Sequence, residues 1–230
     1  MLVRDWMSKN VITIGVDNAM QDATAILKQH RIRILPVVQN GKLVGIITDR
    51  DLKRASASDA TSLEIHELLY LLMRIKIKDI MTRNSIAVPL EWTVEETAEL
   101  LLNNKISGAP VVDEKDRVVG VITQTDLFRV LMSLTGIHAG GIQFAFKTKD
   151  YPGSIKELAD VIREFGGQMV SILSSYDKVP EGYRMVYIRM RHIDRERLAS
   201  LQKRLMEKAA LLYIIDQRED RREFFEEKMI

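Results

Sequence analysis

The 230-residue sequence contains no cysteine, which excludes a disulfide framework and any chemistry that depends on a thiolate. This composition suits a reducing compartment, and we expect the protein in the cytoplasm. Uninterrupted apolar runs are also short: residues 68–73 form one, whereas a membrane-spanning helix needs roughly 20 residues. The first residues include Arg4 and Asp5 instead of the apolar core of a signal peptide. We therefore expect no membrane partner.

The sequence also has no large excess of positive or negative charge. The chain has 34 Lys and Arg residues and 32 Asp and Glu residues, which gives a formal net charge of +2. Nucleic-acid binding needs basic side chains gathered on one face without carboxylates among them, so this balance argues against a nucleic-acid partner. The densest charge run, residues 218–228, mixes both signs with Phe224 and Phe225. We interpret residues 218–230 as a charged, amphipathic C-terminal helix.

Sequence patterns of catalysis are absent too. We find no nucleophile paired with a base, no paired carboxylates placed for acid–base chemistry and no cluster of metal ligands. The Gly-x-x-x-x-Gly-Lys-Ser/Thr loop that cradles ATP phosphates is missing. We therefore expect a protein that is not an enzyme, with no catalytic residues, no metal and no cofactor.

The first part of the chain is an internal repeat, which we find by comparing the sequence with itself. Two blocks match at a shift of 74 positions and a third at 75, after one extra residue in a turn. These blocks are residues 3–7 (VRDWM) with 77–81 (IKDIM), 34–38 (ILPVV) with 108–112 (GAPVV), and 44–52 (VGIITDRDL) with 119–127 (VGVITQTDL). We assign repeat 1 to residues 1–60 and repeat 2 to residues 77–134.

Periodicity predicts the same elements in both repeats. Apolar residues at helical spacing are followed by a short β-branched run, a turn, a second strand and a helix that begins after Thr48 or Thr123. An extended lead-in segment, residues 11–14 or 85–88, precedes the first helix, so each repeat is of the βαββα type. Between the repeats, Thr61 and Glu64 form a capping-box pattern, and we predict a linker helix over 61–76. One such sheet cannot cover its own apolar face, so the two repeats are expected to pack with pseudo-twofold symmetry.

These motifs resemble CBS domains, whose hallmarks are a Pro-Val-Val strand and a Gly-hydrophobic-hydrophobic-Thr-x-x-Asp segment. Both hallmarks occur in both repeats, at residues 36–38 and 45–51 and at 110–112 and 120–126. With its C-terminal domain, the whole chain resembles the bacterial acetoin-utilisation B family. The resemblance implies that an adenine nucleotide binds in the clefts between the repeats as a regulatory ligand.

The Thr-x-x-Asp motif has two interpretations. Thr followed three residues later by Asp at a helix start is a capping box, worth about 1 kcal/mol to the helix. A helix N-terminus also offers free N–H groups to a phosphate, and a nearby carboxylate can accept the hydroxyls of a ribose. The duplication and the family resemblance favour nucleotide binding.

By that resemblance, the Asp of one repeat holds the ribose, and the lead-in segment and strand start of the other repeat enclose the adenine. Site one comprises Thr48, Arg50, Asp51, Ser85, Ile86, Ala87, Ser107, Gly108, Ala109 and Pro110. Site two comprises Thr123, Thr125, Asp126, Val11, Ile12, Thr13, Arg33, Ile34 and Leu35. Site one is the better formed, because Gly108 leaves room for a base, whereas Ile34 is bulky and Gln124 replaces an acid in site two.

Residues 140–217 have the element order βαββαβ, which is the ferredoxin-like arrangement. With Asp150, Tyr151, Pro152 and Gly153 at the first strand-to-helix turn, this part resembles an ACT domain. The resemblance implies a role in dimerisation or in amino-acid binding at this loop. An open sheet face carrying Ile142, Phe144, Val186 or their neighbours would need a partner, so we expect a homodimer.

We conclude that the chain is an α+β protein, a tandem CBS pair followed by an ACT-like domain, and a regulatory sensor of an adenine nucleotide such as AMP, ADP or ATP. A sensor of S-adenosylmethionine, or an accessory protein of a pathway like acetoin utilisation, is the alternative. A regulated enzyme or another protein is a further partner of such a sensor. An enzyme or a DNA-binding regulator fits the sequence less well.

Overall fold

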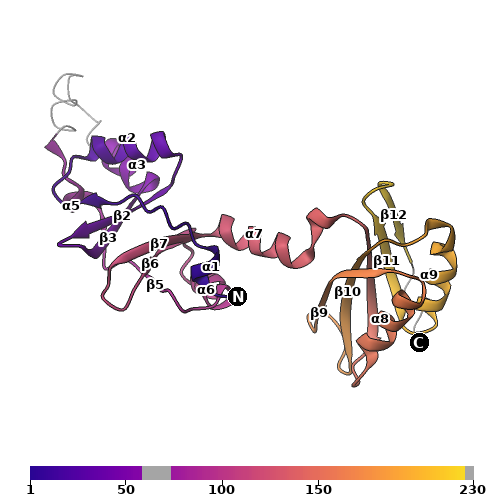
Figure 1. Cartoon of the computed structure of the whole chain (residues 1–230). Helices are drawn as coiled ribbons and strands as arrows, with labels where there is room; N and C mark the ends of the chain where they lie inside the picture. Colours follow the sequence, from indigo (N-terminus) through magenta and orange to yellow (C-terminus); the bar gives the residue numbers. More distant parts are fainter. Residues whose placement is uncertain (59–73, 226–230) are drawn as a thin grey trace. The chain divides into compact units, whose positions relative to one another are not determined.

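Each repeat folds as a short β-sheet with helices beside it, as the alternation of helical and β-branched patterns predicts (Figure 1). The computed structural model describes residues 1–58 and 74–225. Contacts divide the chain into two units, Met1–Phe128 and Arg129–Ile230, and we describe each unit by itself.

The two repeats have matching elements, and the predicted order of helix, strand, turn, strand and helix is confirmed in both. Repeat 1 contains α1 (Val3–Trp6), β1 (Ile14–Gly15), α2 (Met20–His30), β2 (Ile34–Gln39), β3 (Lys42–Thr48) and α3 (Asp49–Ser58). Repeat 2 contains α5 (Ile77–Ile80), β4 (Thr82–Arg83), β5 (Val88–Pro89), α6 (Val94–Asn103), β6 (Gly108–Val112), β7 (Val118–Thr123) and α7 (Gln124–Thr135). One sheet has the order β1-β2-β3-β4 and the other β5-β6-β7.

The first unit is held together by an exchange of short segments between the repeats. Strand β4, at the start of repeat 2, pairs with β3 of repeat 1 so that Thr82 lies opposite Ile46. Ser8, at the start of repeat 1, forms the equivalent antiparallel bridge with Val121 of β7. The shifts of 74 and 75 positions relate these two pairs, so the backbone pairing has the pseudo-twofold symmetry that the repeat predicts.

Apolar side chains of β2 and β3 form the core of repeat 1 with helices α2 and α3. Leu35, Val37 and Ile47 are fully buried there, and Ala23 and Leu27 of α2 pack against them. These positions carry the β-branched and helical periodicities of the sequence, so the core follows directly from the apolar pattern.

The predicted linker helix over 61–76 lies mostly outside the described residues, which resume at Arg74.

The predicted helix over 218–230 is wrong in its described part, since Arg221–Phe224 form strand β12. Strand β12 pairs antiparallel with β11 (Ala210–Asp216), with Phe224 opposite Tyr213. The edge of β11 offers a row of free backbone groups, and residues 217–220 reverse the chain onto it, so hydrogen bonding to the sheet prevails over the local helical pattern. Residues 226–230 lie outside the described part.

The second unit has the predicted order βαββαβ, extended by one strand. It contains η1 (Ile137–Ala139), β8 (Ile142–Lys149), α8 (Ser154–Glu164), β9 (Gln168–Ser175), β10 (Tyr183–Arg191), η2 (Arg195–Arg197), α9 (Leu198–Met206), β11 and β12. The sheet order is β12-β11-β8-β10-β9, and every neighbouring pair is antiparallel. This is the split arrangement in which the first and third strands lie at the centre.

Register decides which face of this sheet is covered. We expected an open face to carry either Ile142, Phe144 and Val186 or their neighbours, depending on register; these three residues are at most 1% exposed and pack in the core with residues of α8 and α9. The opposite face carries their neighbours, including Arg189 of β10. Its guanidinium donates hydrogen bonds to the Thr135 carbonyl oxygen and to the side-chain oxygens of Gln143 and Gln217. Arg189 is itself only 4% exposed, so the centre of this opposite face holds a covered, hydrogen-bonded guanidinium.

Candidate functional site

Thr48 and Asp51 form a complete capping box at the start of α3. The Asp51 Oδ2 atom accepts hydrogen bonds from the Thr48 backbone N–H at 2.9 Å and from its Oγ1 at 2.6 Å. The Asp51 backbone N–H donates in turn to Thr48 Oγ1 at 3.3 Å. One carboxylate oxygen thus stabilises the helix start, while Oδ1 of Asp51 has no hydrogen-bond partner among the described residues. The motif can cap the helix and still offer an acceptor to a ligand.

Thr123 and Asp126 repeat this geometry at the start of α7. Asp126 Oδ2 accepts from the Thr123 backbone N–H at 2.9 Å and from Thr123 Oγ1 at 2.7 Å. Asp126 is only 3% exposed, whereas Asp51 is half-buried. Arg50 and Thr125, between the two motif residues in each repeat, are exposed. The two copies of the motif therefore differ in how accessible their carboxylates are.

Strand pairing places each motif beside the strand start of its own repeat. Thr48 lies opposite Ile34 in the β2–β3 pair, and Thr123 lies opposite Gly108 in the β6–β7 pair. The Gln124 backbone N–H also donates to the Ser107 carbonyl oxygen at 2.9 Å. Exposed Arg33 and Ser107 directly precede these strands.

The lead-in segments run alongside the same strands. Ile14 of β1 pairs in parallel with Val37 of β2, and Val88 of β5 pairs in parallel with Val111 of β6. Parallel pairing carries the preceding residues toward the strand starts, so the candidates fall into two groups. The first group is Val11, Ile12, Thr13, Arg33, Ile34 and Leu35, and the second is Ser85, Ile86, Ala87, Ser107, Gly108, Ala109 and Pro110.

The two groups meet at Gly108. A Cβ placed on Gly108 would lie 2.9 Å from Ile34 Cδ1, 2.8 Å from the Ile122 carbonyl oxygen and 3.0 Å from Thr123 Cγ2. The Ile34 side chain of repeat 1 therefore fills the space that we expected a base to enter beside Gly108. Gly108 is required by close packing between the repeats, and Ala109 and Pro110 are buried with it.

Among the candidate nucleotide-binding residues, Ser85 is the one with a buried side-chain atom that has no hydrogen-bond partner among the described residues. Its Oγ atom is closed to solvent and makes no hydrogen bond within the described part of the chain. A buried hydroxyl without a partner loses its hydration without compensation, at a cost of about 1–3 kcal/mol. Its neighbours Ile86 and Ala87 are partly or fully accessible, and Ile86 is an exposed apolar residue.

The loop that we predicted for an ACT ligand contains an ion pair that the sequence did not indicate. Asp150 Oδ1 lies 2.7 Å from Arg184 Nη2 of β10, a strand far away in the sequence. The Nε atom of Arg184 is buried and has no hydrogen-bond partner in the described structure. Arg184 is one of 34 basic residues, and only the antiparallel register that sets Tyr183 opposite Lys149 brings it to the loop.

The remaining loop residues are fixed by local interactions. The Tyr151 hydroxyl donates to Glu157 Oε1 at 2.8 Å, and this hydrogen bond raises the pKa of the Tyr151 phenol. Gly153 has φ of +99° at the start of α8, a conformation that glycine adopts without strain. Pro152 is exposed beside it.

Across the described ranges 1–58 and 74–225, no three His, Asp or Glu side chains are grouped so that they could hold a metal ion. Within the same ranges, no helix is both long and apolar enough to cross a bilayer.

Comparison with known proteins gives matches to the repeats. The CBS domain model matches residues 3–58 and 77–133. A CBS domain-containing protein of Dictyostelium discoideum is 37% identical over 134 residues, which are 58% of this chain and 92% of that protein. The L-aspartate semialdehyde sulfurtransferase of Methanocaldococcus jannaschii is 38% identical over 130 residues, which are 56% of this chain but only 23% of that enzyme.

Solved structures are similar over the same part. The AcuB protein from Vibrio cholerae is 27% identical and has a TM-score of 0.51, with 60% of this chain and 96% of that chain covered. The CBS domain pair of protein MJ0100, in complex with 5′-methylthioadenosine and S-adenosyl-L-methionine, is 37% identical and has a TM-score of 0.49. That match covers 57% of this chain and 95% of the other.

Proposed function

Since this chain belongs to the CBS domain family, we propose that its paired repeats bind an adenine nucleotide and that the protein is a regulatory ligand sensor. In this proposal Asp51 accepts the ribose hydroxyls through Oδ1, the carboxylate oxygen that the capping box leaves without a partner. Arg50, exposed at the start of α3, binds phosphate together with the free N–H groups of that helix.

The observation that carries the proposal is the unpartnered hydroxyl of Ser85. A polar atom that is closed to solvent is expected to have a hydrogen-bond partner, and an adenine or ribose group supplies one once the groups that cover Ser85 Oγ move aside on binding. Ser85 belongs to the lead-in segment of repeat 2, where parallel pairing of β5 with β6 carries it toward Gly108. An accessible apolar side chain, Ile86, follows directly and offers a surface for the face of the base.

The second motif supports a weaker site. Gln124 occupies the place of Asp49, and its amide nitrogen lies 3.4 Å from the Ile106 carbonyl oxygen of the same repeat. Asp126 is almost fully buried, so a ligand must displace neighbouring groups to reach its carboxylate. We propose that Thr123, Thr125 and Asp126 bind a nucleotide less tightly than Thr48, Arg50 and Asp51.

Titration calorimetry of the full chain with AMP, ADP, ATP and S-adenosylmethionine tests this proposal. We expect a dissociation constant on the order of micromolar for at least one of these compounds. Asp51→Ala is expected to weaken binding roughly tenfold or more, because hydrogen bonds to a charged carboxylate contribute about 1.5–3 kcal/mol. No heat with any of the four compounds would reject the function.

A matched control separates ligand binding from helix capping. Glu96 at the start of α6 accepts from the Thr93 backbone N–H and from Thr93 Oγ1, both at 2.8 Å, so it makes the same bonds as Asp51. Glu96→Ala removes a capping carboxylate outside the proposed site. It should lower stability as Asp51→Ala does and leave nucleotide affinity unchanged. Equal loss of affinity in both variants would show that Asp51 acts only through the fold.

Signalling in this proposal uses the exchanged segments that join the repeats. A ligand shifts a conformational equilibrium only if it binds one state more tightly than the other. Thr82 pairs with Ile46 and Ser8 pairs with Val121, so a change in the angle between the repeats must move both lead-in segments. A regulated enzyme or other protein would respond to that movement.

For the second unit we propose an ACT-like role in homodimer formation. Support comes from the βαββαβ order and from the sheet order β11-β8-β10-β9, which leaves β9 at an edge. Ile172 and Tyr176, on or next to that edge strand, are 40% and 60% exposed. An exposed edge with apolar side chains is suited to pairing with a second copy.

Amino-acid binding at the loop Asp150–Gly153 is a second candidate role. The buried Arg184 Nε atom, which has no partner among the described residues, favours it because a carboxylate could accept from that N–H. Calorimetry with the twenty standard amino acids is the test. Binding that disappears in Arg184→Gln would support the role, and no binding by any of them would exclude it.

A further inference from the structure

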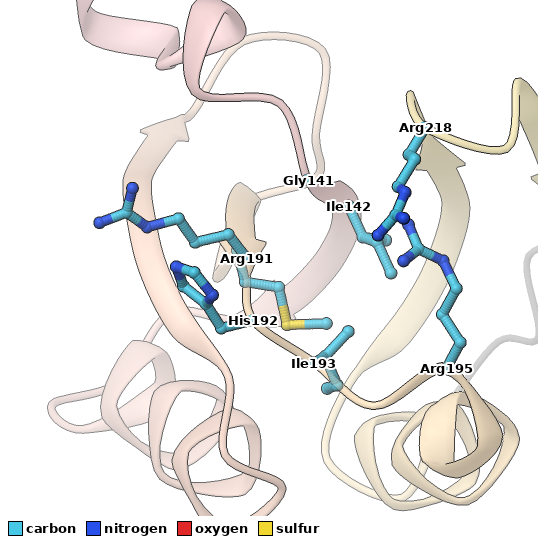
Figure 2. A pocket seen from close by; sticks show the side chains of 8 residues that line it. Gly141, Ile142, Arg191, His192, Ile193, Arg195 and Arg218 are labelled. Carbon is cyan, nitrogen blue, oxygen red and sulfur yellow. The ribbon is translucent and has the colours of Figure 1, made fainter.

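The second unit contains a small cavity at the end of its sheet opposite the Asp150–Gly153 loop. The cavity has a volume of about 160 Å³ and lies where β8 begins and β10 ends. Ile142, Met190 and Ile193 form its apolar lining, and the basic residues around it include Arg195 and Arg218 (Figure 2). No motif of the sequence predicted this cavity.

Two guanidinium groups converge on one side of the cavity. Figure 2 shows the Arg195 and Arg218 side chains reaching toward each other beside Ile142, while Arg191 points away from them. Like charges at short range repel, so such a pair is stable only where anionic groups lie close by.

Of these two arginines, only Arg195 has anionic partners among the described residues. Asp216, which is 2% exposed, accepts from Arg195 Nε and Nη2, each at 3.1 Å. The same carboxylate also accepts the backbone N–H groups of Arg218 and Glu219. Glu219 forms a second ion pair with Arg195, with its Oε1 atom 3.3 Å from Arg195 Nε. These contacts occupy both oxygens of Asp216, so its capacity to accept further hydrogen bonds is largely used.

The guanidinium group of Arg218 makes no hydrogen bond or ion pair within the described structure. It therefore stands beside a neutralised arginine, at the rim of an apolar cavity, with its donors available. A carboxylate can accept two parallel hydrogen bonds from a guanidinium, and the apolar lining can receive a hydrocarbon body.

We propose that this cavity binds a small aliphatic carboxylate, with the carboxylate at Arg218 and Arg195 and the hydrocarbon body against Ile142, Met190 and Ile193. An apolar cavity of roughly 150 Å³ holds a molecule the size of benzene, so the ligand has about six to eight non-hydrogen atoms. This site goes beyond the nucleotide site of the repeats and is separate from the Asp150–Gly153 loop.

The charges also predict what the cavity rejects. The two carboxylates that contact its arginines, Asp216 and Glu219, are already engaged with Arg195. An α-amino acid would therefore bring its ammonium group next to arginines whose carboxylate partners are already occupied. The site should prefer 4-methylpentanoate to leucine, which has the same carbon skeleton with an added amino group.

Amide NMR titrations of the full chain with 4-methylpentanoate, leucine and inorganic phosphate test the proposal. We expect saturable shifts with 4-methylpentanoate at residues 141–142, 190–193 and 216–218, with a dissociation constant on the order of 1 mM. Leucine and phosphate should bind there at least about fivefold more weakly, since the first adds an unpaired cation and the second lacks an apolar body.

Arg218→Gln should weaken 4-methylpentanoate binding about tenfold, because it removes a charge-assisted pair of hydrogen bonds. Arg222→Gln is the control: it removes the same charge from exposed strand β12, away from the cavity, and should change the affinity less than twofold. Neither exposed arginine is part of the core, so both variants should fold. Absence of saturable shifts, equal affinity in Arg218→Gln and the native chain, or equal binding of leucine would each overturn the proposal.

Discussion

Gly45 of β3 lies so close to Thr82 of β4 that a Cβ on Gly45 would be 2.5 Å from the Thr82 carbonyl oxygen. The equivalent glycine in repeat 2, Gly120, faces the side chain of Met7, and a Cβ there would be 2.2 Å from Met7 Sδ. Both glycines permit the exchange of segments that joins the repeats. The neighbour is rigid backbone in one case and a flexible side chain in the other.

This difference predicts unequal costs for the same substitution. Gly45→Ala should lower the free energy of unfolding by about 1–3 kcal/mol, because β4 must move away from β3 to relieve the contact. Gly120→Ala should cost less than about 1 kcal/mol, since the unbranched Met7 side chain can adopt another rotamer. Urea denaturation followed by circular dichroism measures both values. Equal costs, or a larger cost for Gly120→Ala, would show that the Thr82 contact does not hold β4 against β3.

Removal of the Ser85 hydroxyl should weaken ligand binding without lowering the stability of the protein. Ser85→Ala deletes a buried oxygen without a partner, so the free energy of unfolding without ligand should stay unchanged or rise. Nucleotide affinity should fall about three- to tenfold, because the hydroxyl is expected to bond to the ligand. Thermal unfolding and calorimetry give the two measurements.

Ser171→Ala is the matched control for Ser85→Ala. Its Oγ donates to the Thr135 carbonyl oxygen at 3.0 Å, so its removal should cost about 1 kcal/mol of stability and leave nucleotide binding as it is. A clear loss of stability in Ser85→Ala would indicate that this hydroxyl has a structural partner after all.

Asp113, in the turn between β6 and β7, gives a prediction for pH dependence. The hydrogen bond from the Arg117 side chain, with help from the Arg117 and Lys115 backbone N–H groups, lowers the pKa of Asp113 from 3.8 to about 2. A lowered pKa in the folded state means that the charged form stabilises the turn. That contribution is complete above about pH 4 and is lost as the pH falls toward 2.

Carboxyl ¹³C NMR across this pH range measures the Asp113 titration. Arg117→Gln should raise the pKa of Asp113 toward 3.8, because it removes the Arg117 side-chain hydrogen bond, which is the largest cause of the lowered pKa. Lys115→Gln should leave this pKa nearly unchanged, since Lys115 contacts the carboxylate through its backbone N–H. An Asp113 pKa near 3.8 in the native chain would contradict the turn geometry.

We extend the homodimer contact proposed at the β9 edge to a second exposed apolar surface, on α7. Phe128, Leu131 and Met132 lie at helical spacing on this helix and are 62%, 54% and 39% exposed. Light scattering of the full chain should give twice the mass of 26.4 kDa at micromolar concentration. Leu131→Glu should shift the mass toward one chain, because it places a charge in the proposed contact.

Ser133→Glu is the control for that measurement, since Ser133 is an exposed polar residue of the same helix and receives the same charge. It should remain dimeric. A native mass near 26.4 kDa would reject the homodimer, and dissociation of both variants would show that charge alone separates the chains.

Sequence patterns predicted most elements because the relevant information is local or repeated. The β-branched run at residues 34–38 and the helical spacing in 20–27 recur in repeat 2, and both copies fold as expected. The capping bonds of Thr48 and Asp51 also follow from spacing alone, because a residue three positions into a helix faces its cap.

The predictions that were wrong or that left alternatives open concern positions where distant segments meet. Arg221–Phe224 reads as part of a charged helix, and only the free edge of β11 makes it a strand. Ile142 and Phe144 fit either face of an isolated strand, and the packing of α8 and α9 places them in the core. Gly108 suggested room for a base, whereas Ile34 from the other repeat fills that space.

Sequence patterns were sufficient to predict the duplicated repeat, its helices and strands, the two Thr-x-x-Asp caps and the βαββαβ order, since each depends on a repeated block or on residues close together in the chain. Long-range packing was needed to show that Ser85 Oγ is buried without a partner among the described residues, that Arg184 pairs with Asp150, and that Arg195 and Arg218 converge on a cavity. These relationships depend on strand register and on contacts across tens of residues. A shift of one residue in the register of β10 would move Arg184 to the opposite face of its sheet.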